Sequence, residues 1–330
     1  MEYSFHNRNN IINKLLIKLR GVREGTLVLI ILGVCILVSF LSPYFMTWDN
    51  WKAMFLSFST EGIVVVGMTV MLVLGGIDLS VGSVMCLGMC ITGKLFLMGV
   101  NPWVASILAL FICAGMGAVM GLLVTRVGLE YFITTLAFLG IARGACFVIT
   151  QGTPLSLFTL PQSFKFIGQG TIGPFPFVIV IFLIIVVISD GMLRNSTSFR
   201  KVFYVGSNEK AAIFSGIRVK RIKMGVSILS SFLAGIAGII YMARFGAATP
   251  GFGQGLEMTA ISAAVIGGAS LSGGEGSVLG AILGVALLSI ITTSLILLDV
   301  SVYWQDLIKG LILLFAVSID HIRHSKQHGS

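Results

Sequence analysis

The chain is 330 residues long, of which 56% are hydrophobic and only 11% are charged. A water-soluble domain needs roughly a quarter of its residues to be charged, so this composition excludes a soluble globular protein and indicates a protein embedded in lipid. The net charge of +9 does not indicate nucleic-acid binding, because the basic residues gather at a few points along the chain instead of covering one face.

The predicted elements begin with a basic N-terminal arm, residues 1–25, followed by a transmembrane region, residues 26–322. Apolar runs of roughly 20 residues, the length that crosses a bilayer, predict an all-α polytopic membrane protein of about ten transmembrane helices. The eighth run is the weakest, because it is short and leads into a glycine-rich stretch. The ten candidate spans are residues 26–45, 59–76, 81–99, 103–125, 131–150, 174–193, 224–244, 258–269, 277–298 and 303–320.

The basic segments predict how these spans are oriented. Six spans separate the N-terminal arm from a second basic segment, residues 194–223, and four separate that segment from the tail, residues 323–330. Both numbers are even, so all three segments fall on one side. Short loops rich in Lys and Arg stay in the cytoplasm, so both termini are predicted to be cytoplasmic and the loop 151–173 to lie outside.

Two glycine-rich turns resemble each other. Residues 75–80 read Gly-Gly-Ile-Asp-Leu-Ser and residues 267–272 read Gly-Gly-Ala-Ser-Leu-Ser, and a Gly-Ser-Val sequence follows each. Paired glycines and a hydroxyl allow a helix to end and the next to begin in a tight turn. In the first turn, Asp78 is expected to cap the following helix.

Charged residues inside the spans need a reason, because each costs roughly 2.5–3.5 kcal/mol at a helix centre. Arg143 has two open interpretations: a structural residue that forms an ion pair or reaches the interface, or a residue that lines a solute pathway. Glu61 and Glu257 are expected near the outer ends of their spans. Asp306 and Lys309, three residues apart on one helix, are expected to pair.

The segment 194–223 contains a short predicted helix. Asn208 can cap it, Glu209 places a negative charge in its first turn, and Gly216 can adopt the left-handed conformation after its end. A helix of about seven residues is unstable alone in water, so it must dock. Its apolar side is expected to dock either on its own bundle or lipid, or on a partner protein; that side consists of Ala212, Ile213 and Phe214.

Motifs for enzymatic chemistry are missing from the sequence. It contains neither a Gly-x-x-x-x-Gly-Lys-Ser/Thr nucleotide loop nor a His-Glu-x-x-His metal motif. We therefore expect no enzymatic activity and no bound cofactor; ATP and Mg²⁺, if used, would be bound by a partner chain. All five cysteines lie in apolar stretches and all four histidines in the tails, so no metal site is expected. Cys86 and Cys90, which share a helix face, are interpreted as packing residues.

Sequence motifs along most of the chain resemble one family, the permease subunits of bacterial carbohydrate ABC importers of the ribose and simple-sugar type, in the branched-chain amino acid and ribose permease superfamily. Only the first fifty residues and the outer loop lack such motifs. The matching segments are Gly75–Ser83, Phe132–Leu136 with Ala142–Gly144, Gly206–Ala212 with Ser215–Ile217, Gly255–Glu257 with Ala260–Ile261, Ile266–Gly274, and Gln305 with Lys309–Gly310.

This resemblance implies the fold of a type II ABC-importer permease in the bacterial inner membrane and assigns roles to two groups of residues. The first is a cytoplasmic coupling helix that docks on the ATPase subunit, formed by Asn208, Glu209, Lys210, Ala211, Ala212, Phe214 and Gly216. The second comprises candidates for the pathway or its turns: Asp78, Ser80, Thr134, Thr135, Arg143, Gly267, Gly268 and Ser270.

The resemblance also implies partners. They are a second permease chain, identical or paralogous, an ATP-binding subunit, an extracytoplasmic sugar-binding protein and the lipid bilayer. The expected function is ATP-driven import of a sugar or sugar-like polyol. Two alternatives remain open: an ABC permease for nucleosides or branched-chain amino acids, and an ion-coupled secondary transporter. The latter needs ionisable groups near the bilayer midplane.

Overall fold

The computed structural model describes residues 23–328, so most of the predicted basic arm, residues 1–22, and the last two residues, 329–330, lie outside the described part. The described chain is mostly helical, with four two-residue strands. In chain order the elements are α2 (Arg23–Leu41), α3 (Trp48–Val73), α4 (Val81–Leu97), α5 (Pro102–Leu122), the π-helical turn η1 (Leu123–Val127), α6 (Tyr131–Thr150), β1 (Leu155–Ser156), α7 (Gln162–Gln169), β2 (Thr171–Ile172), β3 (Phe175–Pro176), α8 (Phe177–Asn195), α9 (Thr197–Ser207), α10 (Glu209–Phe214), α11 (Val219–Phe245), β4 (Ala247–Ala248), α12 (Leu256–Ile266), α13 (Val278–Leu297) and α14 (Val302–His328).

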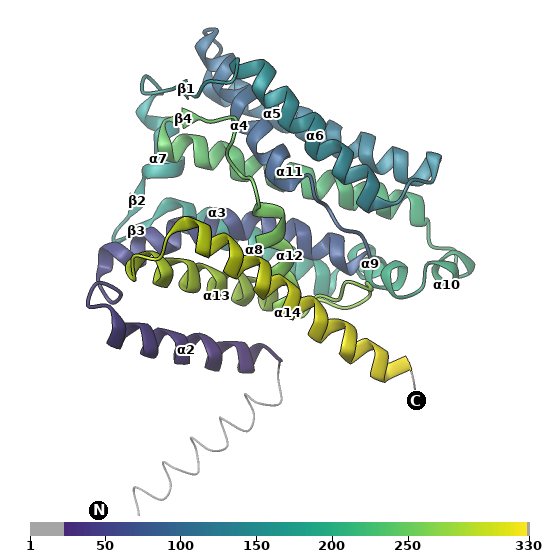
Figure 1. The fold of residues 1–330 in the computed structure, drawn as a ribbon. Helices are drawn as coiled ribbons and strands as arrows, with labels where there is room; N and C mark the ends of the chain where they lie inside the picture. The colour runs from purple at the N-terminus through teal and green to yellow at the C-terminus, as the bar shows by residue number, and fades with distance from the viewer. Residues whose placement is uncertain (1–22, 329–330) are drawn as a thin grey trace, which may run out of the picture.

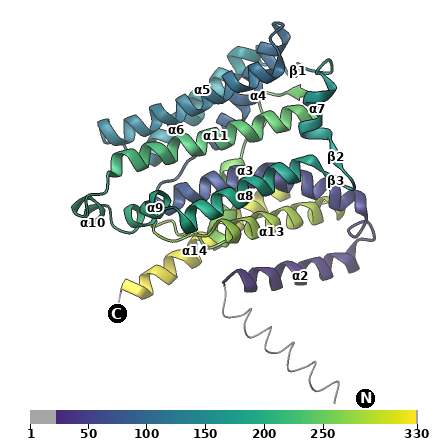
Figure 2. The same ribbon diagram turned by 180° about the vertical axis from the view of Figure 1, so that it is seen from behind.

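The helices form two layers (Figures 1 and 2). One layer contains α4, α5, α6 and α11, and the other contains α3, α8, α12, α13 and α14, with α2 packed on α13. Helix α11 joins the layers, because it packs on α4 and α5 and also on α3. Most of the buried apolar side chains form one cluster that extends through both layers.

The two ends of the bundle carry different elements. Helices α9 and α10 lie at one end, called here the α10 end; β1, β4 and α7 lie at the other, called the β1 end (Figure 1). Strand β1 pairs antiparallel with β4, and β2 with β3. Helix α2 begins, and α14 ends, at the α10 end. The side of the membrane that the α10 end faces stays a prediction.

The helices depart from the predicted spans at two places that matter for function. Seven described helices are long and apolar enough to cross a membrane, so ten helical spans are not confirmed. Helix α12 has 11 residues and is about 16 Å long, roughly half of the bilayer core. The predicted eighth span therefore does not cross as a helix. Helix α3 begins at Trp48, eleven residues before the predicted start of the second span.

Small residues let the helices of the layer formed by α4, α5, α6 and α11 pack closely. A side chain at Gly238 of α11 would collide with the backbone of Met85 in α4, and one at Gly117 of α5 would collide with Ser227 of α11. Because no hydrophobic force draws helices together in lipid, close packing of this kind drives their association. Large apolar side chains cover the outer faces instead, including Phe111 of α5 and Val148 of α6, as expected for surfaces that contact lipid.

Candidate functional site

Two non-helical segments interrupt the bundle, and they position the candidate site. Residues 74–80 precede α4 and residues 249–255 precede α12; they are called here the 74–80 linker and the 249–255 linker. The helices that follow them start inside the bundle (Figure 1). The first turn of α4 touches the 249–255 linker, because Gly82 packs against the carbonyl oxygen of Gly253 so closely that a Cβ atom would not fit.

Non-helical backbone at membrane depth must be satisfied by the protein or line a cavity, and helix α6 provides much of that support. Thr135 Oγ1 donates a hydrogen bond to the carbonyl oxygen of Ile77 in the 74–80 linker at 3.0 Å. Arg143 Nη1 donates to the carbonyl oxygens of Pro250 and Phe252 in the 249–255 linker, at 2.8 and 2.6 Å. One helix therefore holds both linkers.

Asp78 gives the 74–80 linker a second attachment. Its Oδ1 accepts from the backbone N–H and the hydroxyl of Ser80, at 2.9 and 2.6 Å. Its Oδ2 accepts from the hydroxyl of Ser230 on α11 at 2.7 Å. Asp78 thus holds Ser80, the residue before α4. It also connects the linker to α11, a contact that was not part of its expected capping role.

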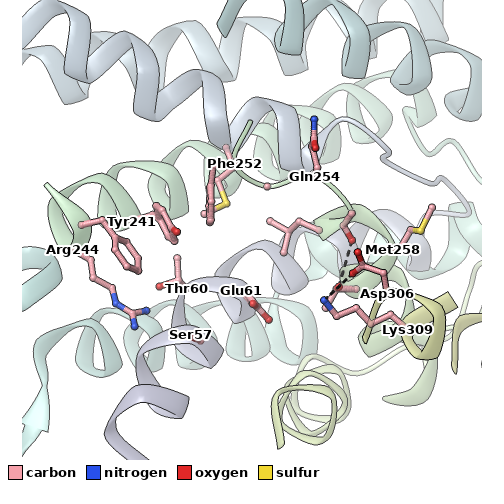
Figure 3. Close-up of a pocket in the computed structure, with 16 residues that line it drawn as sticks. Ser57, Thr60, Glu61, Tyr241, Arg244, Phe252, Gln254, Met258, Asp306 and Lys309 are labelled. Carbon is pink, nitrogen blue, oxygen red and sulfur yellow. Dashed lines mark hydrogen bonds and ion pairs between the residues drawn. The ribbon is translucent and has the colours of Figure 1, made fainter. Parts of the chain in front are cut away.

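A cavity of about 560 Å³ lies beside the 249–255 linker (Figure 3). Five elements form most of its wall: α3, α11, the linker, α12 and α14. The polar and aromatic residues that line it are Ser57, Thr60, Glu61, Tyr241, Arg244, Phe245, Phe252, Gln254, Thr259, Asp306 and Lys309.

The charges around this cavity balance. Glu61 and Asp306 supply two acidic groups and Arg244 and Lys309 two basic ones. Asp306 and Lys309 form the predicted pair, with Oδ1 and Nζ 3.6 Å apart. Neutral polar molecules with several hydroxyls fit such a wall, because carboxylates accept and guanidinium and ammonium groups donate charge-assisted hydrogen bonds.

Aromatic rings supply the apolar part of the wall. Tyr241 and Phe252 stack with ring centroids 3.5 Å apart and planes inclined by 27°, and the Arg244 guanidinium lies 4.8 Å above the ring of Phe245. A cavity of this size with apolar faces and a few convergent polar groups is typical of small-molecule binding sites.

Two expected positions are wrong. Glu61 was expected near an outer span end, but α3 starts earlier than predicted, so Glu61 lies in mid-helix and faces the cavity. Glu257 lies in the first turn of α12, where its Oε1 accepts from the Gly255 N–H at 3.3 Å and its Oε2 approaches Gly82 at the start of α4. A carboxylate is stabilised where two helix N-termini meet.

The predicted pathway candidates lie in the 74–80 linker, on α6 and in the turn after α12. None of the eight lines the cavity among the described residues. Thr134 donates within α6 to the carbonyl oxygen of Glu130. Gly267 packs against the backbone of α13, Gly268 has a φ of 107°, and Ser270 bonds to Asp320 of α14 at 3.3 Å. These three residues build the turn after α12.

The predicted short helix is α10, at the α10 end of the bundle. The Asn208 side chain accepts from the Ala211 N–H at 3.0 Å, and Gly216 adopts a φ of 76°, so the predicted start and end signals are present. Glu209 forms an ion pair with Lys223 at the start of α11, at 2.8 Å. Lys210 is exposed.

The apolar residues of α10 divide between two faces. Ala212 is only 3% exposed and belongs to the core cluster of its own chain, whereas the Phe214 side chain is 90% exposed. The expectation that Ala212 points towards a partner is therefore wrong. The outward apolar surface consists of Ile213 and Phe214.

A glycine junction connects α9, just before α10, to both turns that resemble each other. Gly206 packs against the carbonyl oxygen of Val73 and lies beside Gly274, whose N–H donates to that carbonyl at 2.8 Å. A Cβ atom on Gly273 would lie 2.8 Å from the Gly206 oxygen and 2.9 Å from Gly75 Cα. Backbone from three segments meets here without intervening side chains.

The sequence analysis did not identify the cavity residues Tyr241, Arg244 and Phe252. Tyr241 and Arg244 lie in the last turns of α11, a long apolar helix. A usable signal was present: both precede the sequence Gly-Phe-Gly-Gln-Gly at 251–255, whose glycines indicate backbone that leaves the helical conformation.

Comparisons with known proteins give consistent matches. Residues 51–317 match the family described as branched-chain amino acid transport system, permease component. The ribose import permease of Bacillus subtilis is 35% identical over 86% of this chain and 88% of its own length. The D-allose transport system permease of Escherichia coli is 33% identical over 91% and 92%. The autoinducer 2 import system permease of Yersinia enterocolitica is 32% identical over 90% and 82%. No solved structure matches.

Proposed function

Because this chain belongs to the branched-chain amino acid transport system permease family, we propose that it is the membrane-spanning subunit of an ATP-driven importer for a neutral sugar. Members of this family are transport subunits of the inner membrane and not enzymes. The cavity beside the 249–255 linker is the proposed sugar site.

The observation that carries this proposal is the composition of the cavity wall. The Tyr241–Phe252 stack offers an aromatic face to a sugar ring, and Glu61 and Arg244 offer an acceptor and a donor to its hydroxyls. The equal numbers of acidic and basic groups disfavour a substrate with a net charge. The relatives described as importing ribose and D-allose support the same substrate class.

A branched-chain amino acid is the second candidate, and one specific observation favours it. Arg244 and Glu61 both face the cavity, and such a pair suits the carboxylate and ammonium of an amino acid. The similarity to sugar permeases over about nine-tenths of the chain decides for a sugar.

The proposed assembly contains two permease chains, two ATP-binding subunits and an extracytoplasmic binding protein. The α10 end is proposed to face the cytoplasm, since the segment 194–223 carries eight basic residues and one acidic residue and such loops stay inside. ATP and Mg²⁺ are bound by the ATPase, which docks on Ile213 and Phe214 of α10. The binding protein delivers its ligand at the β1 end.

The decisive experiment is ATP-dependent uptake into proteoliposomes that contain this chain with the ATPase and binding protein of its own transport system. We expect uptake of radiolabelled ribose or allose that excess leucine does not inhibit. Uptake of leucine, unaffected by either sugar, would assign the amino acid instead. Uptake that requires an ion gradient but no ATP would contradict the importer class.

A further inference from the structure

Three buried cysteines outside the proposed sugar site gather at the contact between α4 and α6. Cys86 and Cys90 lie one turn apart on α4, and Cys146 lies near the end of α6. Their Sγ atoms all lie within 4.8 Å of one another, and all three residues are 0% exposed. The sequence analysis expected no metal site because it found only the first two together; helix packing adds the third.

The spacing of these sulfur atoms matches three ligands of one metal ion. A metal–sulfur bond of about 2.3 Å places three thiolates in a plane around the ion about 4 Å apart. The Sγ atoms of Cys86 and Cys90 are 3.9 Å apart, and the other separations need to shorten by less than an ångström. Small rotations of three side chains are sufficient for coordination.

The chemistry of the ligands selects the type of ion. Three thiolates, with no carboxylate or imidazole in the group, favour soft cations over Mg²⁺ or Ca²⁺. The carbonyl oxygens of Thr249 and Pro250 lie 3.4 and 3.3 Å from Cys86 Sγ, so the 249–255 linker adjoins the cluster.

Charge balance favours a divalent ion. Arg143 lies one turn before Cys146 on α6, and its guanidinium is fixed by two carbonyl oxygens of the same linker. Three thiolates, one divalent cation and one guanidinium sum to zero. An uncompensated buried charge is costly, so a monovalent ion, which would leave one negative charge, fits less well.

We propose that Cys86, Cys90 and Cys146 bind one soft divalent cation of the zinc and cadmium class. Binding releases three thiol protons to solvent and forms three metal–sulfur bonds, with no change of oxidation state. The ion would join α4 to α6 directly beside the linker that forms the cavity wall. Because the cluster is fully buried, the ion enters while the helices assemble or when the linker opens.

The test uses the full chain, purified in detergent, with Cd²⁺ supplied both during expression and by titration. We expect one Cd²⁺ per chain, detected by thiolate-to-cadmium ultraviolet absorption and by elemental analysis, and displaced by excess Zn²⁺. Cys90→Ser and Cys146→Ser should each weaken binding by more than about 100-fold, since loss of outer-shell partners alone costs 10- to 100-fold.

Cys113→Ser is the matched control, because Cys113 is equally buried but lies outside the three-cysteine group; it should bind Cd²⁺ like the unmodified chain. Thermal melting of each variant establishes that it is folded. The proposal is overturned if the folded, unmodified chain binds Cd²⁺ neither when the ion is supplied during expression nor when it is added by titration. Undiminished binding by folded Cys146→Ser overturns it equally.

Discussion

Arg143 illustrates at the scale of one residue how an intramembrane charge is used. The sequence left two roles open for Arg143, a structural role and a role in lining a solute pathway, and the structure combines parts of both. Arg143 does not line the cavity, but it holds the backbone of Pro250 and Phe252, and the Phe252 ring is part of the cavity wall. Its guanidinium thus compensates carbonyl groups that a broken helix leaves without partners.

Replacing Arg143 tests this role. Arg143→Ala leaves two carbonyl oxygens without their charge-assisted donor, and each buried unsatisfied group costs about 1–3 kcal/mol. We expect a lower melting temperature in detergent and more than tenfold slower uptake. Arg143→Lys, which retains a donor, should recover part of both. Unchanged melting and uptake in Arg143→Ala would show that the linker does not depend on this contact.

At the scale of secondary-structure elements, hydropathy predicted where helices occur but not where they break. All ten predicted spans overlap a helix, because runs of apolar residues are a strong signal. Helix α12 begins only at Leu256, because the linker before it packs through Gly253 against Gly82, which lies 171 residues earlier in the chain. The local sequence around α12 does not indicate that contact. The cavity depends on the same long-range packing, so its residues could not be assembled from the sequence.

The exposed face of α10 leads to a prediction about coupling. Phe214→Arg places a charge where we propose that Phe214 enters an apolar groove of the ATPase, and an unpaired charge in such an interface costs several kcal/mol. The permease should insert and melt normally, while assembly with the ATPase or sugar-stimulated ATP hydrolysis is lost. Phe158→Arg is the control for assembly with the ATPase, since Phe158 is similarly exposed at the β1 end, away from α10. Normal coupling in Phe214→Arg would assign the contact to another loop.

The glycine junction leads to a second element-scale prediction. A methyl group at Gly206 would collide with the Val73 oxygen and lie 2.7 Å from the Gly274 nitrogen, so Gly206→Ala must displace α9 from the turn that precedes α4 and the turn that follows α12. We expect ATP hydrolysis to continue while the number of sugars transported per ATP falls severalfold. Gly225→Ala, at an open position of α11, should leave this ratio unchanged. An unaltered ratio in Gly206→Ala would mean that motion from α10 takes another route.

At the scale of the whole molecule, the described contacts form a continuous connection from one end of the bundle to its interior. Helix α10 is held by Lys223 of α11 and follows α9, whose Gly206 touches the turns at Gly75 and Gly273. The first of these turns belongs to the 74–80 linker, which precedes α4. The second turn directly follows α12. The start of α4 meets the linker before α12 at Gly82 and Gly253, beside the cavity.

This arrangement explains how hydrolysis on a partner chain can change a site inside the membrane. If the ATPase holds α10 differently in its two nucleotide states, the shift reaches the cavity through backbone contacts, which cannot be absorbed by side-chain rotation. The equilibrium between the two conformations of the permease shifts only if a sugar or a nucleotide binds one conformation more tightly than the other. Alternating access is thus a property of the assembled complex.

The most direct test of the central claim, that the cavity beside the 249–255 linker is the sugar pathway, is thiol labelling of Thr259→Cys in proteoliposomes. Thr259 lines the cavity, whereas the five native cysteines are buried. We expect a methanethiosulfonate reagent to block uptake and bound sugar to slow the labelling. Ser163→Cys, exposed on α7 at the β1 end, should be labelled at a rate that bound sugar does not change. Full uptake after complete labelling of Thr259→Cys would contradict the account.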